Sequence, residues 1–347
     1  MRAIENHPPN GDTRHPEAMV FEIQRLSTED GPGIRTTVFF KGCSLACSWC
    51  HNPESISARP QLHWIASRCI GCGTCCTICP ETALTLLEGD LAIDRSRCTQ
   101  CGQCAANCPS TAMEVIGTCW RLDDLVHEVL KDRAYFSNSG GVTAGGGEPG
   151  LQAPFLSAFF RTLKQAGIHT AVDTCGCYPR RALEEFLPFT DMVLYDLKEI
   201  DPDRHLAFTG RSNEQILDNL KAVGSRMTAG ATPQALWIRT PVIPDATATE
   251  ANIAGLGHWI ADHLKGAVTR WELCAFNNLC RDKYLRLDRD WPFKAHPLLS
   301  PTTMERLAGI ARRSGVDPDI VHWSGSTRMD TETSDAETDQ PTRATLA

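Results

Sequence analysis

The sequence lacks three features that would place a chain in a membrane, outside the cell or on nucleic acid. It has no run of about 18 uncharged apolar residues, the length at which a stretch reads as a membrane-spanning helix. Its first residues, MRAIENHPPNGDTRHPE, contain no apolar core of a secretory signal. Basic residues are not in excess, because 34 Lys and Arg face 42 Asp and Glu, a formal net charge of −8. We therefore expect a cytoplasmic protein with no membrane and no nucleic-acid partner.

Cysteine, by contrast, is abundant. The chain has 17 cysteines, and twelve of them fall between Cys43 and Cys108. Cytoplasmic thiols are kept reduced, and a disulfide scaffold suits a small secreted chain. We therefore favour metal or iron–sulfur ligation over disulfide bonds.

The order of the expected elements indicates an α/β protein. After residue 116, segments with helical periodicity alternate with short apolar runs, which predicts a parallel sheet covered by helices. Counting TTVFFKG as the first strand gives about six strands, too few for a closed eight-stranded barrel. We predict a partial, TIM-like (β/α)6 barrel from residues 19–58 and 117–326, an insert at 59–116, a flexible arm at 1–18 and a disordered tail at 327–347.

Polar or glycine residues follow five strands of this expected sheet. They are Cys43–Cys50, Gly145–Pro149, Asp173 with Thr174, Asp196 with Lys198, and Asn277. In parallel α/β sheets the C-terminal strand ends meet at one edge, where ligands bind. Ordinary loop chemistry would explain any one of these loops, but all of them together with three cysteines predict a site.

The insert carries two copies of one cysteine pattern. Residues 69–80, CIGCGTCCTICP, and 98–109, CTQCGQCAANCP, both fit C-x2-C-x2-C-x3-C-P, which bacterial two-cluster ferredoxins use. In that arrangement the fourth cysteine of each run serves the other cluster. The prediction is one [4Fe–4S] cluster on Cys69, Cys72, Cys75 and Cys108, and a second on Cys98, Cys101, Cys104 and Cys79. Cys76 is left over as a packed thiol, and two zinc sites are the alternative. The insert resembles a bacterial ferredoxin.

Cys43, Cys47 and Cys50 form a separate group, spaced C-x3-C-x2-C, with no fourth cysteine until Cys69. Three ligands leave one position of a metal centre open for a reactant, as in catalytic zinc sites. At the end of the first strand of an α/β barrel, this loop resembles that of the radical S-adenosylmethionine (SAM) superfamily. The resemblance implies a third [4Fe–4S] cluster, whose open iron binds the amino and carboxylate groups of SAM. Packed or zinc-binding cysteines are the alternative.

Four further segments narrow the resemblance to the glycyl-radical-enzyme activating enzymes, such as the pyruvate formate-lyase activase. They are DGPGIRTTVFFKGCSLACSWCHNPES, SGGVTAGGGEPGLQ, VDTCG and LYDLKEID, and the likeness extends over residues 19–325. It implies an oxidoreductase that reductively cleaves SAM to methionine and a 5′-deoxyadenosyl radical. This radical takes a hydrogen atom from a glycine Cα of a large partner enzyme and leaves 5′-deoxyadenosine.

The resemblance also implies roles by position. Cys43, Cys47 and Cys50 hold the catalytic cluster. The implied SAM-binding residues are Trp49, His51, Gly146, Gly147, Glu148, Asp173, Asp196, Leu197, Lys198 and Asn277. Asp173 and Asp196 are also candidates for a monovalent cation beside the SAM carboxylate, with capping of the next helix as the alternative.

The chain departs from the family pattern at three positions. Gly145 stands where relatives often have Ser, Cys175 replaces the usual Asn, and Asn277 stands where the pyruvate formate-lyase activase has His. The sequence leaves open the roles of Asn277 and Cys175.

Three functions are compared. An activase explains all the motifs. An enzyme that modifies a small molecule or peptide directly, like the anaerobic sulfatase maturases, is disfavoured because their extra clusters follow the barrel. A simple electron carrier would not need the three-cysteine loop. We expect a monomer that takes electrons from a flavodoxin or ferredoxin. Which glycyl radical enzyme it activates is not readable from the sequence.

Overall fold

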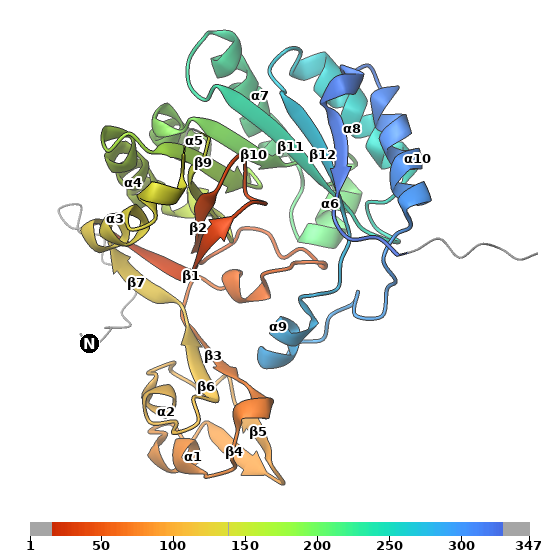
Figure 1. The fold of residues 1–347 in the computed structure, drawn as a ribbon. Coiled ribbons are helices and arrows are strands. Elements are labelled where there is room, and N and C mark those ends of the chain that lie inside the picture. Colours follow the sequence, from red (N-terminus) through yellow and green to blue (C-terminus); the bar gives the residue numbers. More distant parts are fainter. Residues whose placement is uncertain (1–15, 138, 329–347) are drawn as a thin grey trace, which may run out of the picture.

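The computed structural model describes residues 16–137 and 139–328, and a nine-stranded sheet forms its centre (Figure 1). The strand order is β13-β12-β11-β10-β9-β8-β2-β1-β7, and the strands from β2 to β13 run parallel. The parallel strands are β2 (Arg35–Phe40), β8 (Gly141–Gly146), β9 (His169–Thr174), β10 (Met192–Asp196), β11 (Ala235–Val242), β12 (Arg270–Ala275) and β13 (Val321–Ser324). β1 (Glu17–Ser27) and β7 (Thr118–Arg121) extend the sheet in the antiparallel sense. The sheet is curved and open, as in a partial TIM barrel.

Helices cover the outer face of the curved sheet (Figure 1). They are α3 (Leu122–Leu130), α4 (Ala153–Gln165), α5 (Arg180–Phe186), α6 (Pro202–Thr209), α7 (Glu214–Thr228), α8 (Glu250–His263) and α10 (Pro301–Arg312), whereas α9 (Arg281–Arg286) lies between the barrel and the insert. Burial alternates along β11 and β12, because successive side chains point to opposite faces. Ile238 and Leu273 are fully buried in the core that also contains Phe159 of α4 and Leu220 of α7. Arg239, on the opposite face, is half-buried.

Two parts of the barrel prediction need correction. The structure has seven parallel strands, not six, because the short strand β13 was not expected. Its four residues, VHWS, form no apolar run, so the sequence gives little signal there. Helices α6, α9 and α10 were also missed. Two of these begin with clear signals, since Asp201 caps α6 and Ser300 caps α10, each followed by Pro.

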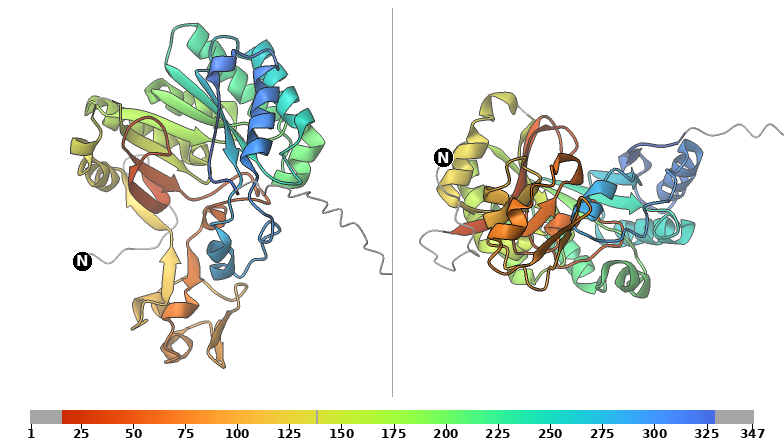
Figure 2. Two further views of the ribbon diagram at one scale, coloured as in Figure 1. Left: turned by 45° about the vertical axis from the view of Figure 1, so that its right-hand side comes forward. Right: turned by 90° about the horizontal axis from the view of Figure 1, so that it is seen from below.

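Residues 59–116 leave the barrel between β2 and β7 and form a small unit at one end of the molecule (Figure 2). β3 (Gln61–Trp64) pairs with β6 (Met113–Ile116), and β4 (Leu84–Leu87) forms a hairpin with β5 (Asp90–Ile93). Two short helices, α1 (Thr74–Ile78) and α2 (Gln103–Ala106), each follow a glycine with left-handed backbone. Leu62, Leu84 and Met113 belong to a separate small core.

Short 3-10 helices connect several of these elements. They are η1 (Pro53–Ser55), η2 (Ala66–Arg68), η3 (Arg133–Tyr135), η4 (Pro149–Gln152), η5 (Leu187–Phe189) and η6 (Pro318–Ile320). The predicted arm at 1–18 overlaps β1, which already begins at Glu17, and residues 1–15 lie outside the described part. In the predicted tail, the Arg328 amide donates to the Leu299 carbonyl, and residues 329–347 lie outside the described part. No helix of the described residues is long and apolar enough to cross a membrane.

Candidate active site

The three-cysteine loop follows β2 directly and is held by backbone hydrogen bonds from several elements. At its start, the Cys43 amide donates to the Ile56 carbonyl at 3.1 Å. In its middle, the Ser48 amide donates to the carbonyl of Phe208, in α6, at 2.9 Å. At its end, the Tyr284 hydroxyl of α9 donates to the Cys50 carbonyl at 2.9 Å. The loop is therefore fixed before any ligand binds.

Burial raises the pKa of two of the three thiols of this loop. Burial raises the pKa of Cys47 to about 11, and burial also raises the pKa of Cys50 well above its usual range. Cys43 adds to both shifts through charge repulsion, so the three sulfurs interact. A bound cation is what deprotonates such thiols. Three cysteines on one loop are a donor set that fits an iron–sulfur cluster.

Within residues 16–137 and 139–328, no three His, Cys, Asp or Glu side chains converge tightly enough to hold one metal ion. In a four-iron cluster each thiolate binds a different iron, so such convergence is not what its ligands require.

The glycine loop after β8 packs directly against the start of the cysteine loop. Gly146 has a left-handed φ of 111°, and a Cβ there would lie 2.6 Å from the Phe40 backbone nitrogen and oxygen. A Cβ on Gly147 would lie 2.2 Å from the Gly42 carbonyl oxygen. The Gly147 amide donates to Phe40 and the Glu148 amide to Gly42, at 2.8 and 2.7 Å. Only glycine allows this close approach of two backbones.

Glu148 joins two loops of this edge. Its side chain is fully buried, and its carboxylate accepts hydrogen bonds from the Gly150 amide, the Thr174 hydroxyl and the Cys175 amide at 2.8–2.9 Å. Burial raises the pKa of this carboxyl. Its oxygens accept from groups of both loops, so Glu148 joins the glycine loop to the loop after β9.

The two aspartates at the ends of β9 and β10 each face a positive side chain. Asp173 pairs with Arg239 of β11 at 3.0 Å, and Asp196 pairs with Lys198 at 2.5 Å. Burial raises the pKa of Asp173 to about 7 against the opposing effect of Arg239. The capping alternative for both aspartates is wrong, because α6 is capped by Asp201 and the residue before α5 is Pro179.

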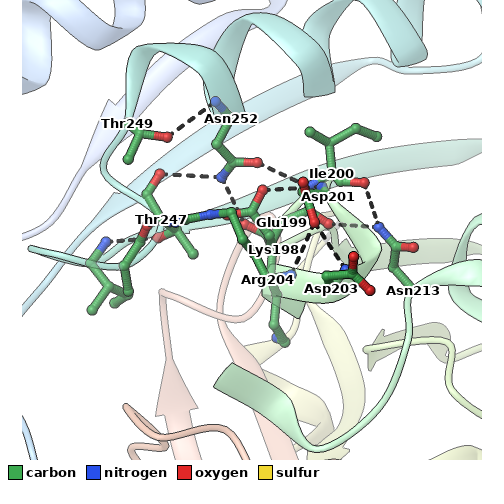
Figure 3. Close-up of polar contacts among 12 residues, drawn as sticks. Lys198, Glu199, Ile200, Asp201, Asp203, Arg204, Asn213, Thr247, Thr249 and Asn252 are labelled. Atoms are coloured by element: carbon green, nitrogen blue, oxygen red, sulfur yellow. Dashed lines mark hydrogen bonds and ion pairs between the residues drawn. The ribbon is translucent and has the colours of Figure 1, made fainter. Parts of the chain in front are cut away.

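The segment around Lys198 is fixed by two asparagines that the sequence analysis did not identify (Figure 3). Asn252 of α8 donates to the Lys198 carbonyl at 3.1 Å and accepts from the Ile200 amide at 2.9 Å. Asn213 donates to the Glu199 and Ile200 carbonyls at 2.9 and 2.8 Å. Both asparagines are buried, and the available signal was an amide residue at the start of each expected helix.

Trp49 is core rather than surface. It is 5% exposed, and its ring lies 5.7 Å from the ring centroid of Phe208 and 6.3 Å from that of Phe293. Burial lowers the pKa of His51, which also makes a hydrogen bond with the Asn277 backbone. The structure thus brings the predicted residues His51 and Asn277 together, and the buried Nε2 of His51 has no partner among the described residues.

The insert contains two hollows, and each is lined by four cysteines. One is lined by Cys79, Cys98, Cys101 and Cys104. The other is lined by Cys69, Cys72, Cys75 and Cys108. These are the two predicted sets, including the exchange of the fourth cysteine between the runs. Cys76 lines neither hollow.

Taken together, the fold and the site define an open α/β barrel with a three-cysteine loop, a glycine loop and paired charges at the C-terminal strand edge. A model described as the radical SAM superfamily matches residues 37–252.

Several relatives share most of the chain. The indoleacetate decarboxylase activating enzyme of Tractidigestivibacter scatoligenes is 35% identical over 312 residues, covering 86% of this chain and 96% of that one. The isethionate sulfite-lyase activating enzyme of Nitratidesulfovibrio vulgaris is 38% identical over 307 residues, covering 87% and 97%. A solved domain of a pyruvate-formate lyase-activating enzyme from Bacteroides vulgatus is 27% identical and covers 54% of this chain and 99% of that chain, with a TM-score of 0.42. The chain belongs to the radical SAM superfamily and, within it, to the glycyl-radical-enzyme activating enzymes.

Proposed function

We propose that this chain binds SAM at the C-terminal edge of its barrel and installs a radical on a glycine of a large partner enzyme. When bound, the cluster supplies an electron that splits SAM into methionine and a 5′-deoxyadenosyl radical, which takes a hydrogen atom from the glycine. The observation that carries this proposal is the three-cysteine loop packed against the glycine loop at one edge. The three thiols hold the cluster and leave one iron open for SAM.

Residues at the C-terminal edge of the barrel hold SAM in position. Gly147 and the Lys198 segment contact it, while Glu148, Asn213 and Asn252 hold those contacts in place. A monovalent cation between Asp173 and Asp196 is part of the proposal, and such an ion would share these carboxylates with Arg239 and Lys198. His51 and Asn277 lie together and form the adenine side of the site.

The insert is proposed to hold two further [4Fe–4S] clusters in its two cysteine-lined hollows. Cys72 and Cys101 are exposed, so each hollow has a ligand at the surface. An external flavodoxin or ferredoxin can therefore approach the insert clusters, which relay electrons to the catalytic cluster.

The partner differs among the relatives, whose names refer to a decarboxylase, a sulfite-lyase and a dehydratase. We therefore propose the partner only as a large glycyl radical enzyme. The test is anaerobic incubation of the chain with SAM, a strong reductant and the large enzyme encoded beside it. The expected result is a doublet glycyl-type radical signal on that enzyme and one 5′-deoxyadenosine per radical. Repeated turnover of a small molecule or short peptide, with no radical on any co-encoded protein, would establish direct modification instead.

A further inference from the structure

Lys41 is a buried cation that neither the fold nor the SAM site accounts for. It lies between β2 and the cysteine loop, two residues before Cys43, and its side chain is 1% exposed. Its ammonium group donates to the Glu54 carbonyl, to the Ser57 carbonyl at 3.1 Å and to the Gln61 side-chain oxygen at 3.0 Å. An ammonium has three protons to donate, so all of them are used.

The three acceptors belong to two different parts of the molecule. Glu54 and Ser57 lie just after the cysteine loop, in and beyond η1. Gln61 is the first residue of β3, the strand that begins the insert, and it pairs with Ile116 at the end of β6. One side chain therefore links the end of the cysteine loop to the start of the insert.

Two chain segments, here called the stems, join the insert to the barrel, one at the start of β3 and one at the end of β6. The second stem also packs against the Lys41 side chain. Gly117 directly follows β6 and has a left-handed φ of 114°. A Cβ at this position would lie 2.7 Å from Cδ and 2.9 Å from Cε of Lys41. Both stems of the insert thus touch Lys41, one by a hydrogen bond and one by close packing.

The acceptors of Lys41 favour a geometric role over simple charge pairing. The Glu54 carboxylate is bound to Lys283 of α9 at 2.7 Å, and the contact between Glu54 and Lys41 is made by the backbone carbonyl. Lys41 forms no ion pair within residues 16–137 and 139–328, and a buried charge without such a partner is costly, so an apolar residue of similar size would often be as stable. What an apolar residue lacks is the ability to fix three oxygens at defined positions.

We infer that Lys41 is a positioning residue that fixes the insert relative to the cysteine loop. This inference rests on the proposed function, because its consequence is the distance over which electrons pass from the insert to the catalytic cluster. In that step a reduced insert cluster loses one electron and the catalytic cluster gains it. A low-potential one-electron donor protein then restores the insert cluster.

Three variants of the reconstituted protein separate this role from general stability. Lys41→Met keeps the length of the side chain and removes its charge. Gln61→Leu removes only the acceptor on the insert and leaves the bonds to Glu54 and Ser57. Arg97→Met is the matched control, because the exposed Arg97 side chain also donates a hydrogen bond from the insert, but to the Thr82 hydroxyl within the insert rather than to a stem.

The first measurement is hydrogen exchange of the stem amides, residues 58–65 and 111–120. We expect exchange in Lys41→Met to be at least about tenfold faster, the factor for losing one hydrogen bond to a charged group. Gln61→Leu should show a smaller increase in the same stems, and Arg97→Met none there. Unchanged stems in both Lys41→Met and Gln61→Leu, or an equal increase throughout α4 and β9, would overturn the inference.

The second measurement concerns electron transfer. In Gln61→Leu, SAM cleavage driven by a donor protein should slow, while cleavage driven by titanium(III) citrate, which can reduce the catalytic cluster directly, should stay close to wild type. The magnetic coupling between reduced insert and catalytic clusters should also change. Equal loss with both reductants would contradict the positioning role. If the insert bound no iron, the proposed relay would fail, yet hydrogen exchange of the stems would still decide whether Lys41 fixes the insert.

Discussion

At the scale of single residues, the buried carboxylate of Glu148 holds two loops together at the C-terminal edge of the barrel. Its two oxygens accept from groups on the loops after β8 and β9, so the glycine loop and the Cys175 loop share one side chain. Replacing one of these oxygens by an amide NH2 would place a donor against another donor.

We predict that Glu148→Gln lowers the free energy of unfolding by about 1–3 kcal/mol, the cost of a buried group left without its partner. The substitution should also weaken SAM binding, because Glu148 directly follows Gly147, which is proposed to contact SAM. Urea unfolding and equilibrium binding of SAM check the two effects. Glu184→Gln is the control, since Glu184 is exposed on α5, and it should change neither quantity. Equal stability of the two variants would show that Glu148 does not hold the loops.

His63 makes the stability of the molecule depend on pH. It lies on β3, is 4% exposed, and its Nε2 has no partner among the described residues. Burial lowers the pKa of its imidazole to about 4, and the positive charges of Arg286, Arg95 and Lys41 act in the same direction. The unfolded chain binds this proton at a higher pH than the folded chain. The stability that neutral His63 contributes is therefore present above the ordinary pKa and is lost as the pH falls toward 4.

We predict that His63→Phe removes part of this loss. Between about pH 7 and about pH 5, the wild-type unfolding free energy should fall by roughly 2 kcal/mol more than that of the variant. Anaerobic urea titrations at the two pH values provide the measurement. His127→Phe, at an exposed position of α3, should retain the wild-type pH dependence. Parallel pH profiles for wild type and His63→Phe would disprove the assignment.

At the scale of elements, the short helix α9 acts as a clamp on the cysteine loop. Tyr284 donates to the Cys50 carbonyl at 2.9 Å, and Lys283 binds the Asn52 side chain and the Glu54 carboxylate, each at 2.7 Å. At the end of the same helix, the Arg286 carbonyl accepts a hydrogen bond from Arg95 of the insert. One helix of six residues therefore contacts the loop and the insert.

We predict that Tyr284→Phe loosens the cysteine loop without unfolding the barrel. Loss of one hydrogen bond should cost about 1 kcal/mol, and amide exchange within residues 43–52 should accelerate while that of α4 stays constant. Tyr135→Phe supplies the control, because Tyr135 is 55% exposed in η3, far along the chain from the loop. If both variants exchange like wild type, α9 is not a clamp.

The contacts of α9 show which kind of feature could not be predicted from the sequence. The cysteine loop, the glycine loop and the six expected strands were predictable because each depends on a short local pattern. The hydrogen bond between Tyr284 and Cys50 joins residues more than two hundred positions apart, and no local sequence pattern at either residue predicts it. Asn213, Asn252 and Lys41 are similar cases, because their roles come from the burial that tertiary packing imposes. Trp49 was read as a SAM contact, and only the fold reveals the aromatic cluster around it.

At the scale of the whole molecule, eleven of the 17 cysteines form three groups that the fold keeps apart. Three lie at the barrel edge, and two sets of four line separate hollows in the insert. We predict about twelve irons in the anaerobically reconstituted chain, four for each cluster. Iron and sulfide analysis with Mössbauer spectroscopy provides the count. Iron near four per chain, or stoichiometric zinc, would contradict the assignment of the insert.

The same separation predicts a division of labour between the groups. Cys47 lies on the loop that packs against the glycine loop and the Lys198 segment, so its cluster is the one that meets SAM. Cys101 is exposed at the surface of the insert and belongs to a hollow with no SAM-site residue in its lining. We therefore predict that Cys47→Ala abolishes SAM cleavage, whereas Cys101→Ala retains slow cleavage with a strong artificial reductant and loses cleavage driven by a donor protein. The measurement is 5′-deoxyadenosine formed per chain under both reductants, with circular dichroism to establish that both variants are folded. Equal loss of cleavage in two well-folded variants would mean that the insert takes part in the SAM chemistry itself, and the description of the insert as a relay would have to be abandoned.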